Sequence, residues 1–262
     1  MDINKTYVAY FSPTFATRDV VRKMGEIVNR KYHEFDLTDY DNRNTAHDFE
    51  RNELLIIGAP TFSGRIPNVA KERINKLRGH NTPCIVAVTY GNRDYDNALL
   101  ELKDMMENLG FKVVGATAII TQHSIVKSIA TDRPNTGDLD SIKVFVEMVM
   151  DKLERVNSVI AEDLYVPGNP EYINKENHNQ PLKYHLNRKR CDECGVCIKM
   201  CPVQAIEPGR PIKIDSSKCF GCMRCIKVCP KRAREYNRTK YSVLKLYLRN
   251  NCEKGRKNEF YL

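Results

Sequence analysis

The stretch Cys191–Pro230 decides how this chain is organised. It reads CDECGVCIKMCP over residues 191–202 and CFGCMRCIKVCP over residues 219–230. Both halves have the cysteine spacing C-x₂-C-x₂-C-x₃-C-P, and eight of the ten cysteines lie here. The stretch is therefore an internal repeat.

Eight thiols at this spacing indicate ligands of iron–sulfur clusters. Cysteines at i, i+3 and i+6 wrap one turn around a cubane cluster, and a fourth cysteine completes the set from elsewhere in the chain. Zinc is the alternative, but zinc sites usually hold two cysteine pairs across a longer spacer. Disulfides are the other alternative, although metal-spaced thiols without an export signal are typical of a reducing compartment. The stretch predicts two [4Fe–4S] clusters.

The composition is that of a globular protein with one unit of ordinary size and one small unit. The chain has 262 residues, of which 42% are apolar and 29% are charged, and these proportions support a packed core. No window approaches eighteen uncharged apolar residues, and no basic and then apolar leader precedes the first strand. We therefore expect no membrane span and a cytoplasmic location.

Positive charge is concentrated in the last third of the chain. The net charge is +9, and residues 168–262 hold 21 Lys and Arg against 9 Asp and Glu, while residues 1–167 hold 21 against 24. Such asymmetry can indicate nucleic-acid binding. However, a thiolate-bound cubane cluster carries about −2, and a flavin phosphate adds about −2. Because bound cofactors would neutralise much of the excess, we expect no nucleic-acid partner.

Upstream of the cysteines, short apolar strands alternate with amphipathic helices. The expected strands are 5–11, 32–37, 53–60, 84–89 and 112–120, and the expected helices are 18–30, 68–77, 96–109 and 138–159. Continuous apolar strands joined by helices predict an α/β fold with a doubly wound, five-stranded parallel sheet covered on both faces. Ligands of such sheets bind at the carboxyl ends of the strands.

Three unusual loops follow strands at that edge. The first, residues 12–17, reads SPTFAT and offers hydroxyls and helix N-terminal N–H groups to a phosphate. No Lys or Arg lies inside it, which favours a phosphate monoester over a triphosphate with magnesium. An ordinary helix N-cap at Ser12 or Thr14 explains the same residues equally well. The loops at 59–66 and 90–95 carry aromatic residues, so the three loops together describe a flat cofactor with a phosphate tail.

Residues 1–160 resemble a flavodoxin, whose first loop has the pattern T/S-x-T-G-x-T/S. The resemblance implies that the hydroxyls of the first loop hold the phosphate of FMN. Phe15 stands at the position where flavodoxins usually have glycine, and a positive φ is unfavourable for a residue with a side chain. It also implies that the other two loops embrace the ring. Phe62, Tyr90 and Tyr95 are the stacking candidates, although Phe62 and Tyr95 could instead be loop aromatics that cap the sheet. The implied flavin-binding residues are Ser12, Thr14, Phe15, Ala16, Thr17, Pro60, Thr61, Phe62, Ser63, Gly64, Thr89, Tyr90, Gly91, Asn92 and Tyr95.

The cysteine stretch resembles a bacterial two-cluster ferredoxin, in which the fourth cysteine of each run serves the other cluster. The resemblance therefore implies two ligand sets that cross between the halves. The first set is Cys191, Cys194, Cys197 and Cys229, and the second is Cys219, Cys222, Cys225 and Cys201. Short paired strands are expected at 205–206 and 212–215, between the halves.

The whole chain resembles the flavodoxin–ferredoxin fusion proteins of anaerobic bacteria. The expected units are a flavodoxin-like FMN unit at 1–163, a linker or wrapping arm at 164–185, a ferredoxin unit at 186–240 and a tail with one short helix at 241–262. The resemblance implies an electron-transfer protein that relays electrons between the clusters and FMN, with an unidentified redox protein as donor or acceptor.

Two further functions stay open at this point. One is a flavin-dependent reductase of a small molecule, fed by the clusters, in which His123 or Tyr90 would donate protons. The other is a redox sensor whose basic half binds nucleic acid. The motif G-x-G-x-x-G is absent from the sequence, so a nicotinamide site is not indicated.

Overall fold

The main sheet of the molecule contains five parallel strands in the order β2-β1-β4-β6-β7. The computed structural model describes residues 2–155, 163–171, 184–208, 213–252 and 256–262. The strand bounds are β1 (Lys5–Tyr10), β2 (His33–Asp36), β4 (Glu53–Pro60), β6 (Thr82–Tyr90) and β7 (Phe111–Ile120). Counted within this sheet, the order is 2-1-3-4-5, which is the flavodoxin-like order. The predicted parallel sheet is confirmed.

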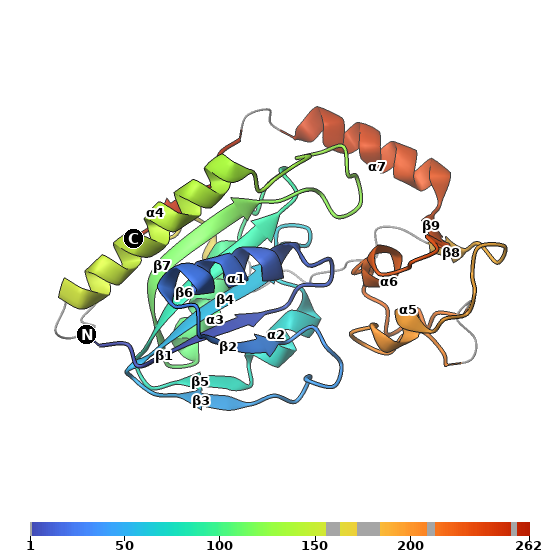
Figure 1. The fold of residues 1–262 in the computed structure, drawn as a ribbon. Coiled ribbons are helices and arrows are strands. Elements are labelled where there is room, and N and C mark those ends of the chain that lie inside the picture. Colours follow the sequence, from blue (N-terminus) through green and yellow to red (C-terminus); the bar gives the residue numbers. More distant parts are fainter. Residues whose placement is uncertain (1, 156–162, 172–183, 209–212, 253–255) are drawn as a thin grey trace.

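Helices cover both faces of this sheet (Figure 1). Successive strand residues alternate between the two faces, so Val8 and Ile56 belong to one core and Ala9 and Ile57 to the other. The first core is closed by α1 (Ala16–Val28) and α4 (Thr136–Arg155), and the second by α2 (Asn68–Ile74) and α3 (Ala98–Asn108). The fold is therefore doubly wound, as the alternation of strands and helices predicted.

The predicted helices exist, but their ends differ. The second helix ends at Ile74 and not at Leu77, because Leu77 begins β5 (Leu77–Gly79). This strand pairs in parallel with β3 (His47–Phe49) in a small second sheet that was not predicted. Residues 156–159 of the predicted last helix lie outside the described residues.

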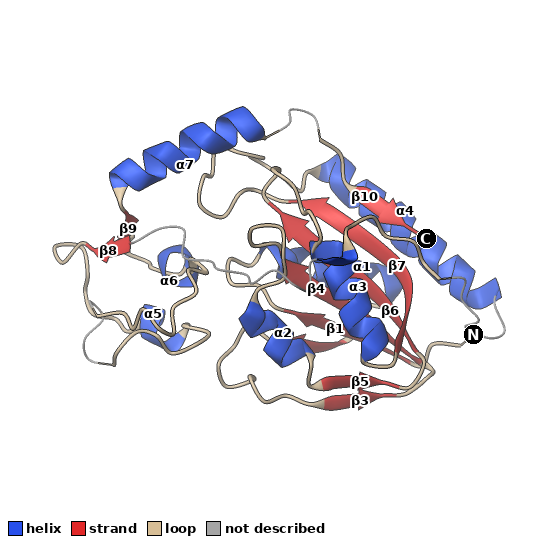
Figure 2. Ribbon diagram, turned by 180° about the vertical axis from the view of Figure 1, so that it is seen from behind, coloured by secondary structure: helices blue, strands red, loops and turns tan. Residues whose placement is uncertain are grey.

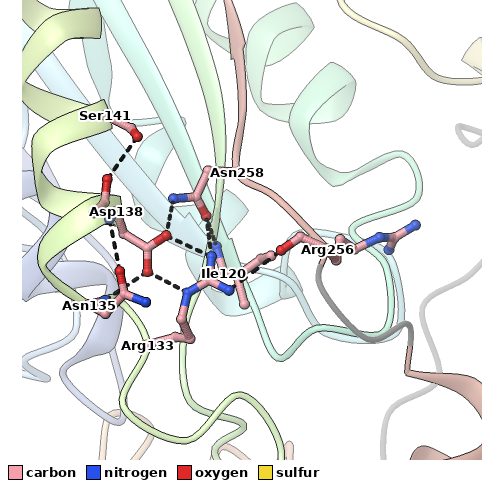
Figure 3. Close-up of polar contacts among 8 residues, drawn as sticks. Ile120, Arg133, Asn135, Asp138, Ser141, Arg256 and Asn258 are labelled. Atoms are coloured by element: carbon pink, nitrogen blue, oxygen red, sulfur yellow. Dashed lines mark hydrogen bonds and ion pairs between the residues drawn. The ribbon is translucent and has the colours of Figure 1, made fainter.

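A sixth strand corrects the expectation of five. This strand, β10 (Glu259–Tyr261), pairs antiparallel with β7 at the edge of the main sheet. The residue before it, Asn258, accepts a hydrogen bond from the Ile120 backbone N–H at 2.9 Å and donates one to Asp138 of α4 at 2.9 Å (Figure 3). The tail therefore completes the sheet, a role that its three-residue strand does not reveal in the sequence.

The cysteine stretch folds into a small unit of two similar halves. Each half carries the third cysteine of its run on a one-turn helix, α5 (Val196–Lys199) or α6 (Arg224–Lys227). An antiparallel pair joins β8 (Tyr184–Leu186) to β9 (Arg234–Tyr236). An isolated bridge joins Ile206 to Ile214, within the two segments where paired strands were expected. In both ribbon views α6 lies between the main sheet and the β8–β9 pair (Figures 1 and 2).

The described part of the chain between α4 and β8, residues 163–171, packs against the sheet unit. Leu164 and Val166 are buried in the core that α3 closes. The Asn169 backbone N–H donates to the side chain of Asn97 at 2.8 Å. The described part of the predicted arm before β8, residues 164–171, therefore packs on the sheet unit, and residues 172–183 of the arm lie outside the described residues.

The predicted tail helix is α7 (Arg238–Asn251), which leads from the small unit back toward the sheet (Figure 2). Its buried residue Leu248 packs on Val126 and Ile129, in the loop that follows β7. Among the residues that the structure describes, no helix has both the length and the apolar character needed to cross a bilayer.

Candidate redox sites

Each predicted set of four cysteines borders its own cavity. One cavity is lined by Cys191, Cys194, Cys197 and Cys229, and the other by Cys201, Cys219, Cys222 and Cys225. All eight thiols are free of disulfides. In the described residues, no three His, Cys, Asp or Glu side chains are grouped closely enough to bind one metal ion. Each crossed set that the ferredoxin resemblance implied therefore lies around one cavity, although its thiols are not close enough together to share a single ion.

The two halves repeat the same backbone geometry around their cysteines. The fourth cysteine of each run accepts a hydrogen bond from an alanine N–H four residues later, at 3.3 Å for Cys201 and 3.2 Å for Cys229. The residue before each one-turn helix has a positive φ, 74° at Gly195 and 65° at Met223. A left-handed methionine is uncommon, so its conformation indicates that the surrounding fold fixes this turn.

A cavity of about 480 Å³ lies where the carboxyl edge of the sheet faces the small unit. The loops after β4, β6 and β7 contribute to it, as do the cysteine loop and α7. Its lining includes Thr61, Phe62, Ser63, Gly64, Tyr90, Gly91, His123, Phe220, Gly221, Met223, Leu244 and Tyr247. Six of the predicted flavin-binding residues therefore surround one cavity.

Two polar atoms at this cavity are buried without a protein partner among the described residues. They are the Thr61 hydroxyl and the Tyr90 hydroxyl. Burial raises the pKa of Tyr90 well above its usual value, so the phenol stays protonated and can donate a hydrogen bond. Buried polar groups are normally paired. These two hydroxyls therefore have hydrogen-bonding capacity that the described residues do not use, in side chains that border the cavity.

His123 presents a third polar group to the same cavity. Its Nδ1 accepts hydrogen bonds from the backbone N–H groups of Ile125 and Val126, at 3.1 and 3.0 Å. Nδ1 is thus an acceptor, and the ring proton is assigned to Nε2. Burial lowers the pKa of His123 to about 4, so the imidazole is neutral at pH 7. A Cβ added to Gly91 would lie 2.4 Å from His123 Cδ2, so the glycine lets the ring approach the loop.

The first loop does not border this cavity, and two of its three hydroxyls already have protein partners. Ser12 Oγ accepts a hydrogen bond from the Arg18 N–H at 3.0 Å. Thr17 Oγ1 lies 2.7 Å from Thr89 Oγ1, which links the first loop to the end of β6. Thr14 is half-buried in the turn. A phosphate here would contact mainly backbone N–H groups, in contrast to the expected three hydroxyls.

Phe15 adopts the backbone conformation that its glycine-like position requires. Its φ is 75°, in the left-handed region, and it directly precedes Ala16, the first residue of α1. The aromatic ring lies between two guanidinium groups, with Arg18 at 4.5 Å and Arg224 at 5.1 Å from the ring centre. These cation–π contacts offset part of the cost of the backbone conformation.

Tyr95 differs from its expected role as a stacking aromatic. It is buried, and its hydroxyl bonds to Glu259 at 2.6 Å and to Tyr261 at 2.9 Å, both in β10. It does not border the cavity. Three other candidates also lie outside the lining, namely Pro60 and Thr89 at the ends of paired strands and Asn92 in a left-handed turn.

Each unit contributes one buried arginine that donates hydrogen bonds to backbone carbonyls of the other unit. Arg73 of α2 donates to the carbonyl of Pro202, directly after Cys201, and also to the Leu37 carbonyl at 2.5 Å. In return, Arg224 of the cysteine loop donates to the Ser12 carbonyl at 3.2 Å. Arginines that donate to buried carbonyls fix the relative position of the two backbones.

One aromatic residue of the cysteine loop, Phe220, lies near two aromatic residues of the sheet unit. Phe220 lies with its ring centre 6.1 Å from that of Phe11 and 6.3 Å from that of Phe62. Sequence reasoning missed Phe220 and Arg224. The two cysteine runs differ at these positions, with Asp192 and Val196 in the first run. That difference is the signal that could have identified the run facing the sheet.

Comparison with known proteins identifies a family for the cysteine stretch. Residues 182–233 match the family described as the 4Fe-4S dicluster domain. No curated protein matches the chain. A flavodoxin-like sheet and a 4Fe-4S dicluster domain in one chain is the organisation of a flavodoxin–ferredoxin fusion, as the sequence predicted.

Several solved structures are similar to the first part of the chain. An archaeal flavodoxin has 15% identity and a TM-score of 0.39, covering 58% of this chain and 99% of its own. Flavodoxin 2 from Bacillus cereus has 12% identity and a TM-score of 0.42, covering 56% and 99%. Rubredoxin oxygen:oxidoreductase from the anaerobe Desulfovibrio gigas has 15% identity and a TM-score of 0.40, covering 58% and 37%. The fold assignment itself rests on the strand order.

The residues at the sheet edge fit a flavin. Thr61 and Tyr90 border the cavity with hydroxyls that no other described residue pairs with, and Phe62 offers an apolar face to a flat ring. The N-terminus of the 13-residue helix α1 suits a phosphate. The Thr17–Thr89 contact connects the phosphate loop to the strand that leads into the cavity.

Proposed function

We propose that this protein relays electrons between two [4Fe–4S] clusters and one FMN held in the same chain. The proposed cluster ligands are the two cysteine sets, and the proposed flavin site is the cavity together with the first loop. When bound, each cluster carries one electron at a time and the flavin accepts two, so two single-electron deliveries from an external redox protein reduce one flavin.

One observation carries the proposal. Phe220 lines both the 480 Å³ cavity and the cysteine cavity of Cys201, Cys219, Cys222 and Cys225. The two candidate sites therefore share a wall that is one side chain thick. The neighbouring Gly221 and Met223 line the large cavity as well. Electron transfer needs only such proximity and no substrate pocket, and the proton that accompanies two-electron reduction of a flavin would come from solvent.

This arrangement also suggests an order for the relay. The cavity of Cys191, Cys194, Cys197 and Cys229 is lined entirely by residues of the small unit. Cys194 is exposed, whereas Cys201 and Cys225 are buried. We therefore assign the first set to an outer cluster that meets the external partner. The second set is assigned to an inner cluster that lies against the flavin site.

The chain's own residues hold this geometry. Arg73 and Arg224 bind carbonyls across the junction of the two units, and the ring of Phe220 lies near those of Phe11 and Phe62 in the sheet unit. His123, neutral at pH 7, can donate through Nε2 into the cavity. Nothing in the described residues favours the alternative reductase over the relay.

The test is an anaerobic preparation with measured iron, acid-labile sulfide and flavin, followed by rapid reduction with a one-electron donor. About eight irons and one FMN per chain are expected, with cluster bleaching preceding flavin bleaching. Cys222→Ala should keep the FMN but slow its reduction, while Cys252→Ala should leave the rate unchanged. Equal rates in both variants, or zinc without sulfide, would refute the relay.

A further inference from the structure

The first loop has no cation of its own, and the guanidinium of the neighbouring Arg18 is paired with Asp19 at 2.8 Å. Residues 12–17 contain no Lys or Arg, and the Ser12 and Thr17 hydroxyls are already bonded within the protein. What the loop offers is the start of α1, where the N–H groups of Ala16 and Thr17 have no acceptor within the helix. A helix N-terminus alone attracts an anion only weakly. A tight phosphate site would need a further positive charge.

Arg224 of the cysteine loop brings that charge to the loop. Its residue is 4% exposed, and its Nη1 lies 3.2 Å from the Ser12 carbonyl and 3.5 Å from the Pro13 carbonyl. Its guanidinium carbon lies 5.1 Å from the centre of the Phe15 ring, the residue that precedes α1. The cation is therefore buried at the phosphate loop, although it belongs to the other unit.

Arg224 is also incompletely satisfied. Within the described residues, its Nε is buried without a hydrogen-bond partner, and the acceptors of its Nη1 are two backbone carbonyls, which carry no formal charge. A buried guanidinium without a counter-charge is costly, because its desolvation is not repaid. A phosphate dianion at the start of α1 would supply both the charge and the acceptor.

We propose that Arg224 binds the phosphate of FMN, so that the cluster-binding segment supplies the cation that the flavin loop lacks. The proposal rests on the flavin site of the proposed function and adds to it the residue that selects the phosphorylated cofactor. Arg224 stands between Cys222 and Cys225 of the inner set. Phosphate binding and the docking of the inner cluster therefore stabilise each other.

The test compares FMN with riboflavin, which lacks the phosphate. Flavin is stripped from the cluster-containing protein under anaerobic conditions, and each flavin is titrated by the quenching of its fluorescence. The unaltered protein should prefer FMN strongly. Arg224→Gln should reduce that preference about 10- to 100-fold, the range of one or two charge-assisted hydrogen bonds, with riboflavin affinity nearly unchanged. Arg224→Lys should keep part of the preference.

The control is Lys227→Gln, which removes one positive charge from the exposed side of the same helix. It should leave the preference for FMN intact. An unchanged ratio of FMN to riboflavin affinity in Arg224→Gln would overturn the role of Arg224, while an unaltered protein that binds neither flavin would overturn the flavin site itself. If Arg224→Gln loses iron, Arg224→Lys decides, because a preference equal to that of the unaltered protein would refute a need for the guanidinium.

Discussion

Glu101 on α3 forms hydrogen bonds with the loop after β4, which borders the large cavity. It is 2% exposed, and its carboxylate accepts four hydrogen bonds. Arg65 donates twice, from Nε at 2.9 Å and from Nη2 at 2.7 Å, while the Ile66 N–H donates at 2.9 Å and Lys71 Nζ at 3.1 Å. Burial alone would raise the pKa of Glu101, but the bonds from Arg65 and Ile66 and the charge of Lys71 hold it below its usual value.

Glu101→Gln keeps the shape of this side chain and removes its charge. The amide retains one acceptor oxygen but turns an NH₂ group toward cations. Each hydrogen bond to a charged group contributes about 1.5–3 kcal/mol, and breaking a buried ion pair costs about 3–5 kcal/mol. We expect Glu101→Gln to lower the free energy of unfolding by about 3–5 kcal/mol, which corresponds to a fall in Tm on the order of 10 °C.

The assay is thermal unfolding followed by circular dichroism, at equal iron and flavin content. Glu147→Gln is the control, because Glu147 lies on α4 and pairs with Lys143 at 3.7 Å in an i,i+4 pair whose two side chains are exposed. Such pairs contribute about 0.5 kcal/mol. If Glu101→Gln costs no more than this control, the loop does not depend on the buried carboxylate and the reasoning fails.

Three further outcomes can be measured. His123 stays neutral in the folded protein down to about pH 4, whereas a histidine in the unfolded chain takes up a proton near pH 6.5. The free energy of unfolding should therefore fall by up to about 3 kcal/mol as the pH is lowered from 6.5 to 4. His123→Gln should abolish this pH dependence, which denaturation at a series of pH values measures. Tyr95→Phe should cost about 1–2 kcal/mol in urea denaturation, because it removes the hydroxyl that bonds to Glu259; no measurable loss would mean that β10 does not depend on this contact. Cys225→Ala should lower the iron content to about half of roughly eight atoms, whereas Cys252→Ala should retain it all, and equal iron in the two would contradict the ligand assignment.

The parts of the fold that could be predicted from the sequence are those with strong local signals. The apolar strands predicted the parallel sheet because burial on both faces demands continuous apolar residues. The cysteine spacing predicted two ligand sets, and the same sets border the two cavities. In both cases, the residues that carry the signal lie close together in the sequence.

The junction between the units could not be predicted in the same way. Arg224 and Ser12 are separated by 212 positions in the sequence, and neither residue type indicates the other. Two cavity-lining residues, Leu244 and Tyr247, come from a helix whose sequence shows only that it is amphipathic. Comparing the two runs would have helped, because Phe220 and Met223 replace Asp192 and Gly195. Apolar residues at those positions indicate a covered face.

Tyr95 shows why a loop aromatic is a weak predictor of cofactor stacking. The sequence places it beside Tyr90, which does line the cavity. Its hydroxyl found partners in β10, 164 and 166 residues away. The predicted role rested on its place in a loop at the carboxyl edge of the sheet, and the unpredicted sixth strand supplies this side chain with other partners.

The return of the chain to the sheet has a mechanical consequence. The small unit leaves the sheet unit after α4 and rejoins it through α7 and β10, so it is an insertion with two covalent attachments. A module on one linker samples a wide volume, and its effective concentration at the target site falls as the linker lengthens. A module attached at two points has a much smaller range of rigid-body motion. Its inner cysteine set therefore stays beside the sheet edge in every molecule, independent of protein concentration.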